Sequence, residues 1–156
     1  KEDDCDSIID DIFKMSNTNS CSIIYPEDVV TGKNIESKPQ FKELNEIEND
    51  DLILDIGPKT IRKIKKIIEN SKTVLWNGPA GYFENPNFAK GSYEIAKIIT
   101  KQNKDNQIYS VAGGGDTIAV LNQINAINDF NFVSTAGGAF LEYLEGKELP
   151  GIKALN

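Results

Sequence analysis

The sequence predicts an α/β fold, a Rossmann-like parallel sheet with helices on both faces. Two observations lead to this prediction. From residue 52 onward, short apolar segments of strand length alternate with segments of helical periodicity, the order of a mostly parallel sheet. Two strand–glycine–helix segments also repeat each other, at 109–116 and 132–139. Such turns lie at the carboxyl ends of parallel strands, where ligands bind, so the repeat indicates where a site would form.

The first third of the chain is less regular. Apolar residues at helical spacing predict an amphipathic helix that opens the chain and ends near residue 17. These residues are Ile8, Ile9, Ile12 and Met15. Ser22–Tyr25 predicts a short strand closed by Pro26. Residues 31–51 are polar and rich in acids, so we expect a surface loop with a little edge structure there.

The alternation after residue 51 gives four strands and four helices. The first strand leads into its helix through a Gly57-Pro58 turn. We expect strands at 52–56, 73–76, 107–111 and 132–134, and helices at 60–70, 88–100, 116–124 and 139–144. A length of 156 residues with 39% hydrophobic content suits one domain with its own core.

Composition excludes several function classes. The chain has 24 acidic and 17 basic residues, a net charge of −7, and no stripe of Lys or Arg, so we expect no nucleic-acid partner. It has no His, which excludes His-based catalysis, and we expect Cys5 and Cys21 to be reduced thiols. No apolar run approaches the roughly 20 residues of a membrane span, and the acidic start lacks the order of a secretory signal. We therefore expect a cytoplasmic protein without membrane contact.

The glycine turns suit a phosphate group. Consecutive glycines let backbone N–H groups approach a ligand, and the start of a helix adds partial positive charge. The segment Gly113–Thr117 fits neither the Walker form nor the dinucleotide fingerprint, so a tight connection without a ligand is the alternative. Asp116 can cap the helix, or it can hold Mg²⁺ beside a phosphate. Thr117 can donate its hydroxyl to the same phosphate, or it can be an ordinary residue of the first helical turn.

The loop Trp76–Glu84 combines rigid turns with aromatic rings and one acid. Phe83 or Pro79 offers apolar surface to a base, and Glu84 can accept hydrogen bonds from ribose hydroxyls. The alternatives are a core position for Trp76 and a solvated surface position for Glu84. The glycine turns and this loop contain no Lys or Arg, and the single arginine, Arg62, is far from them in sequence. Because phosphoryl transfer needs cations, we infer that the chain is part of a longer protein.

Three segments together carry a family resemblance. Val74–Glu84 reads VLWNGPAGYFE, Gly113–Thr117 reads GGGDT, and Ser134–Ala139 reads STAGGA. In this order they resemble phosphoglycerate kinase, and the resemblance extends over nearly the whole chain. It matches the later part of the C-terminal, nucleotide-binding domain, so residues 1–156 are interpreted as a partial domain. The N-terminal domain, which binds 3-phosphoglycerate in the family, is absent from this chain.

The resemblance implies a role for each candidate residue. Glu84 would hold the ribose, and the pocket would be lined by Leu54, Asn77, Pro79 and Phe83. The nucleotide phosphates would be cradled by Gly113, Gly114, Gly115, Asp116 and Thr117, with Mg²⁺ at Asp116. The backbone N–H groups of Gly115 and Gly138 would face the transferred phosphoryl group. Ala136 stands where the family usually has a glycine, and we expect little effect from it.

The resemblance also implies the reaction and its partners. The intact enzyme would transfer a phosphoryl group between 1,3-bisphosphoglycerate and ADP, giving 3-phosphoglycerate and ATP in glycolysis. MgADP and MgATP would bind this chain, 3-phosphoglycerate would bind the missing domain, and the intact protein would be a monomer. This piece alone is expected to be inactive, because the family closes two domains to exclude water. The alternatives are a noncatalytic nucleotide-binding module with the same glycine turns and a structural domain without a ligand.

Overall fold

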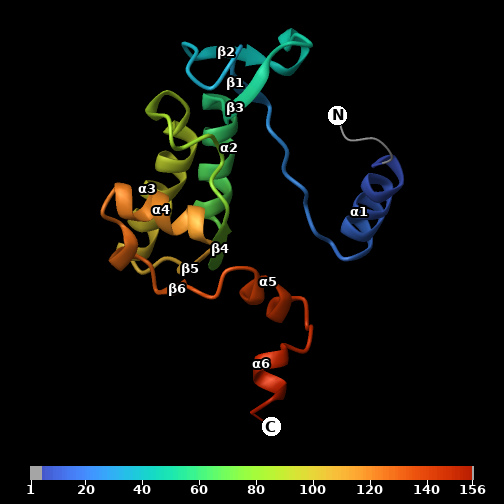
Figure 1. The fold of residues 1–156 in the computed structure, drawn as a ribbon, viewed down its shortest axis with the longest axis vertical. Coiled ribbons are helices and arrows are strands. Elements are labelled where there is room, and N and C mark those ends of the chain that lie inside the picture. Colours follow the sequence, from blue (N-terminus) through green and yellow to red (C-terminus); the bar gives the residue numbers. More distant parts are fainter. Residues whose placement is uncertain (1–4, 156) are drawn as a thin grey trace.

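The computed structural model describes residues 5–155. Its strands form two separate three-stranded sheets, and its helices connect and flank them (Figure 1). The strands are β1 (Asp28–Gly32), β2 (Gln40–Glu43), β3 (Leu52–Ile56), β4 (Thr73–Asn77), β5 (Tyr109–Gly113) and β6 (Phe132–Ser134). The α-helices are α1 (Asp6–Thr18), α2 (Pro58–Glu69), α3 (Lys90–Lys104), α4 (Gly115–Gln123), α5 (Gly138–Leu144) and α6 (Pro150–Lys153). Short 3₁₀ turns are η1 (Leu44–Glu46), η2 (Pro86–Phe88) and η3 (Ile127–Asp129).

The second half of the chain forms a parallel sheet in the order β4-β5-β6. Helix α3 connects β4 to β5, and α4 connects β5 to β6. Because the strands are added in sequence order and such crossovers are right-handed, both helices pack on the same face. The predicted α/β class, with a parallel sheet flanked by helices, is confirmed.

The main core lies between this sheet and its helices. Trp76 on β4 is buried there, and its ring stacks on Phe130 with centroids 6.4 Å apart. The core position weighed for Trp76 is therefore correct. Each helix covering the sheet contributes apolar side chains to this core, Ile68 from α2, Ile95 and Ile99 from α3, and Val120 and Leu121 from α4.

The opposite face of the parallel sheet is largely open. Leu75, Tyr109 and Phe132 are 45%, 52% and 50% exposed. Helix α5 reaches the end of this sheet through Phe140, whose ring lies next to Gly113. We expected helices on both faces, but within residues 5–155 they cover one face extensively, while on the other face these three large side chains remain exposed.

The first sheet is antiparallel, in the order β2-β1-β3. The strand expected at 22–25 is wrong, because these residues have no hydrogen-bonded strand beside them, and the strand after Pro26 begins at Asp28 instead. The loop expected over 31–51 contains β2 and the end of β1. Strand β3 forms where expected, but it pairs with β1 rather than joining the parallel sheet.

Helix α1 lies apart from both sheets, as the blue helix in Figure 1 shows. It confirms the predicted amphipathic helix and ends at Thr18. None of its residues is buried, and its apolar side chains, among them Ile12 and Met15, are exposed. Within residues 5–155 no helix has the length and apolar character needed to cross a bilayer.

Candidate nucleotide site

Three strands of the parallel sheet end at the same level. Asn77 on β4 lies opposite Gly113 on β5, and Gly113 lies opposite Ser134 on β6. The two glycine turns that follow β5 and β6 are therefore neighbours at the carboxyl edge of the sheet. Each turn contains a glycine with positive φ, Gly114 at +89° and Gly137 at +55°. This is the position at which open parallel sheets bind ligands.

The turn after β5 is packed against β4. A Cβ atom on Gly114 would lie 2.8 Å from the Asn77 side-chain oxygen, so only glycine allows this approach. Gly113 is buried, and a Cβ there would lie 2.9 Å from the Phe140 ring. In contrast, Gly115 and Gly138 are exposed and have no such neighbours within 4 Å. The open backbone of the two turns is thus at Gly115 and Gly138, while Gly113 is buried next to the Phe140 ring.

Asp116 and Thr117 have different environments in the first turn of α4. Asp116 is exposed, and the helix has no side-chain cap, so the capping role weighed for Asp116 is not observed. Thr117 is fully buried. Its hydroxyl oxygen accepts a hydrogen bond from the Gly78 N–H, with 2.7 Å between nitrogen and oxygen. Thr117 therefore connects the glycine turn to the loop that follows β4.

The loop 78–84 is held by three different elements. The Gly78 N–H bonds Thr117 on α4, and the Ala80 N–H bonds the Ser92 hydroxyl on α3 at 3.0 Å. The Tyr82 N–H bonds the Leu54 carbonyl on β3 at 2.7 Å. Three backbone N–H groups of the loop are thus anchored, which fixes the loop although it has no helix or strand of its own. The sequence predicted the loop but not Ser92, because its partner is twelve residues away and no motif marks the pair.

A cavity of about 460 Å³ opens between β3 and this loop. Leu54 and Pro79, both predicted pocket residues, lie on its wall. Phe83 does not line it, because its ring is 7% exposed and packs in the main core. Its ring contributes to the core, and its contact with a base stays a prediction. Glu84 is exposed, outside the cavity lining, as is Asn77, which stands at the strand ends. The other lining residues are Pro26, Val29, Ile53, Asp55, Ile56, Ala80, Gly81 and Tyr82.

Comparison with known proteins agrees with the resemblance. The family model described as phosphoglycerate kinase matches residues 1–147. The chain belongs to the phosphoglycerate kinase family. A phosphoglycerate kinase from Zymomonas mobilis is 45% identical over 146 residues, and one from a Chelativorans species is 44% identical over 137 residues. These matches cover 92% and 86% of this chain but 37% and 34% of the relatives. The chain thus spans little more than a third of their length.

Solved structures of the family share the fold. Phosphoglycerate kinase from Coxiella burnetii superposes with a TM-score of 0.89 at 34% identity, over 99% of this chain and 40% of that one. The enzyme from Pyrococcus horikoshii gives a TM-score of 0.75 at 29% identity, over 96% of this chain and 37% of that one. The elements of this chain are therefore arranged as in the corresponding part of family members.

A buried carboxylate stands beside the cavity of this family member. Asp55 on β3 is 2% exposed. Burial raises the pKa of Asp55 to about 6, although the Gly91 and Ile56 N–H groups and the charge of Lys90 act in the opposite direction. On β1, Asp28 is also buried, but the Lys59 and Thr60 backbone N–H groups outweigh burial and lower its pKa.

The family resemblance implies Mg²⁺ beside the nucleotide phosphates, and the carboxylates of residues 5–155 differ in how well they fit such a cation. Asp116 fits as a single exposed ligand beside the glycine turn, since Mg²⁺ uses one or two carboxylates together with substrate phosphates and water. Among residues 5–155, one group of three acids lies close enough to share a cation, Glu48, Asp50 and Asp51. Lys33 lies 2.6 Å from Asp50, and Lys42 lies 2.7 Å from Asp51. These two ammonium groups offset two of the three negative charges of that group.

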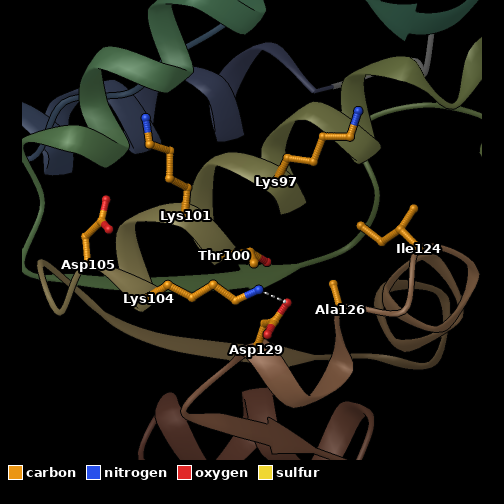
Figure 2. Close-up of a pocket in the computed structure, with 8 residues that line it drawn as sticks. All are labelled: Lys97, Thr100, Lys101, Lys104, Asp105, Ile124, Ala126 and Asp129. Carbon is orange, nitrogen blue, oxygen red and sulfur yellow. Dashed lines mark ion pairs between the residues drawn. The ribbon is translucent and has the colours of Figure 1, made fainter.

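A second cavity, of about 390 Å³, lies along the C-terminal half of α3 (Figure 2). Lys104 is ion-paired with Asp129 across it, with 3.0 Å between nitrogen and oxygen. Lys97, which also lines it, pairs with Glu94. The first turn of α3 contacts Asp55 through Gly91, whereas this cavity lies along the other end of the helix. The cavity is therefore separate from the strand ends that carry the family motifs.

Proposed function

We propose that this chain is the nucleotide-binding part of a phosphoglycerate kinase. In the intact protein it would take part in phosphoryl transfer between 1,3-bisphosphoglycerate and ADP, giving 3-phosphoglycerate and ATP in the cytoplasm. The observation that supports this most is the register Asn77–Gly113–Ser134. It aligns two glycine turns and brings the loop 78–84 to the same edge of the sheet.

The proposal assigns the cavity by the loop to the nucleoside. Leu54 and Pro79 offer apolar surface to the base, and the exposed Glu84 accepts hydrogen bonds from the ribose. The phosphates extend from there along the turn at Gly113–Thr117. Asn77 holds that turn by lying against Gly114. In this arrangement Phe83 acts by supporting the loop from the core.

The transferred group would meet the open backbone of both turns. The N–H groups of Gly115 and Gly138 stabilise negative charge on it, which is how preorganised backbone donors assist acyl and phosphoryl transfer. Asp116 would hold Mg²⁺, which supplies positive charge to the phosphate oxygens when it is bound. No histidine or other base is needed, because the acceptor is already anionic.

The positively charged side chains that the reaction needs lie outside the glycine turns and the loop 78–84. The glycine turns and the loop 78–84 contain no Lys or Arg. Positively charged groups that bind 3-phosphoglycerate and the transferred phosphoryl group would come from the remainder of a longer protein. We therefore expect the chain alone to bind MgADP weakly and to show no turnover.

Calorimetric titration of the 156-residue chain with MgADP tests the proposal. We expect saturable binding that Asp116→Asn weakens by about tenfold, the effect of losing one charged ligand to a shared cation. Asp10→Asn on α1 is the matched control, because it removes the same charge from an exposed helix remote from the site, and it should leave the affinity unchanged. Absence of saturable binding, or equal weakening by both variants, would contradict the proposal.

A further inference from the structure

Asp55 lies where β3, α3 and the loop 78–84 meet. One carboxylate oxygen, Oδ2, accepts a hydrogen bond from the Gly91 N–H in the first turn of α3, at 2.7 Å. The other, Oδ1, accepts from the Ile56 N–H at 2.8 Å. Both oxygens are thus satisfied by backbone N–H groups, and one of these bonds joins β3 to α3.

Two glycines pack against the same carboxylate. A Cβ atom on Gly81 would lie 2.4 Å from Asp55 Oδ1, and a Cβ atom on Gly91 would lie 2.2 Å from it. Real Cβ atoms do not approach other atoms this closely, so both positions require glycine. The carboxylate is therefore wedged between the loop, at Gly81, and the start of α3, at Gly91.

We propose that Asp55 is a positioning residue for the nucleotide, which rests on the function proposed above. By contacting Gly81 it fixes the distance between the loop 78–84 and β3, and this distance sets the width of the 460 Å³ cavity. The Tyr82–Leu54 and Ala80–Ser92 hydrogen bonds then form on both sides of Gly81. Asp55 acts on a bound nucleoside through this loop and does not touch the reacting phosphoryl group.

The chain contains a matched carboxylate with no such loop beside it. Asp28 on β1 is buried and accepts hydrogen bonds from the Lys59 and Thr60 N–H groups at the start of α2, both at 2.8 Å. A Cβ on Gly57 would lie 2.2 Å from its carboxyl carbon. Asp28 thus joins a strand to a helix start as Asp55 does, but the glycine beside it belongs to the β3–α2 turn. Asp28→Asn therefore measures the loss of a buried strand–helix bond alone.

Two readouts separate positioning from stability. The first is amide hydrogen exchange by NMR at Ala80 and Tyr82, relative to Val111 in the centre of the parallel sheet. We expect Asp55→Asn to raise this ratio about tenfold or more, because an amide side chain has one acceptor oxygen for two N–H donors. The second is MgADP affinity under conditions where both variants are folded. We expect Asp55→Asn to weaken it about tenfold, and Asp28→Asn to change neither readout.

The wild-type chain provides a measurement that needs no substitution. The chain has no His, and Asp28 stays ionised because its pKa is lowered, so Asp55 is the carboxylate expected to titrate near pH 6. Lys90 on α3 is the charged group that acts on it. The amide signals of Gly91, Ala80 and Tyr82 should then shift together with one midpoint near pH 6. This test holds even if Asp55→Asn does not fold.

The outcomes distinguish this inference from the proposed function. Unchanged exchange at Ala80 and Tyr82 in a folded Asp55→Asn variant would overturn the inference, as would equal effects of Asp28→Asn. If the amide signals of Ala80 and Tyr82 do not shift with the same pH midpoint as the Gly91 signal, the inference is overturned as well. If the wild-type chain binds no MgADP, the proposed function fails, while exchange and pH titration still decide whether Asp55 holds the loop.

Discussion

Gly114 and Gly115 are neighbours in the turn after β5 but meet different constraints. Gly114 has φ +89°, a conformation that side chains with a Cβ rarely adopt, and its missing Cβ makes room for the Asn77 side chain. Gly115 is the first residue of α4, and a Cβ atom added to it would meet no atom within 4 Å. The turn after β5 thus needs Gly114 for its backbone conformation, and Gly115 leaves its backbone open to a ligand.

Alanine substitutions at these two positions should therefore have opposite effects. Gly114→Ala should lower the free energy of unfolding by about 1–3 kcal/mol, because it adds backbone strain and a contact with Asn77. Gly115→Ala should leave it unchanged or raise it by up to about 1 kcal/mol, because alanine suits the first turn of a helix. Urea denaturation followed by circular dichroism measures both. Equal destabilisation would show that the turn after β5 does not have the stated conformation.

The elements differ in how well local sequence predicts them. Helices α2, α3 and α4 and strands β4, β5 and β6 follow from their apolar period, because each buries one face against a single core. Strand β1 was missed because all five of its residues are buried, and β2 because it is four residues long and half exposed. Their pairing partners are distant in sequence, and period alone does not specify pairing.

Some features of the candidate site could be predicted from the sequence as well, and others could not. The glycine turns and the loop 78–84 were recognisable because their residues are contiguous. The bonds that hold them were not predictable, since Thr117–Gly78, Ser92–Ala80 and Asp55–Gly91 join residues that only the fold brings together. Phe83 illustrates the limit, because an aromatic residue in a loop suits a base and a core equally well.

The contributions of Asp55 and Asp28 to the stability of the chain should change with pH in opposite directions. Asp55 has a folded pKa of about 6, above the ~3.9 of an unfolded chain, so its contribution is fully present below about pH 4 and is lost as pH rises through 6. Asp28 has a lowered folded pKa, so its contribution is present above about pH 4 and is lost as pH falls through its folded value.

Stability should therefore be greatest near pH 4, and should decrease between about pH 4 and 6 as Asp55 ionises in the folded chain. The chain has no His, which removes the usual cause of a slope in this range. Urea unfolding at a series of pH values measures the curve. Asp55→Asn should remove the decrease between about pH 4 and 6 and leave the loss of stability below pH 4 in place. A decrease between pH 4 and 6 that survives this substitution would assign it to another group.

The parallel sheet has one face covered by helices and one open face. Strand alternation places Leu75 and Thr73 of β4 on the open side, in register with Val111 and Tyr109 of β5. Phe132 lies beside Val111 on β6. A row of half-exposed apolar side chains on a flat sheet is a surface that binds other apolar groups.

The 156-residue chain should therefore bind a hydrophobic dye and self-associate with rising concentration. Leu75→Glu should reduce dye fluorescence and shift sedimentation toward the monomer, because it replaces apolar area in the middle of the open face with a charge. Thr73→Glu is the matched control, since it adds the same charge to the same strand and face without removing a large apolar side chain. If the two variants behave alike, charge rather than apolar area controls association. If neither changes dye binding, the dye binds another apolar surface, such as that of α1, where Ile12 and Met15 are exposed.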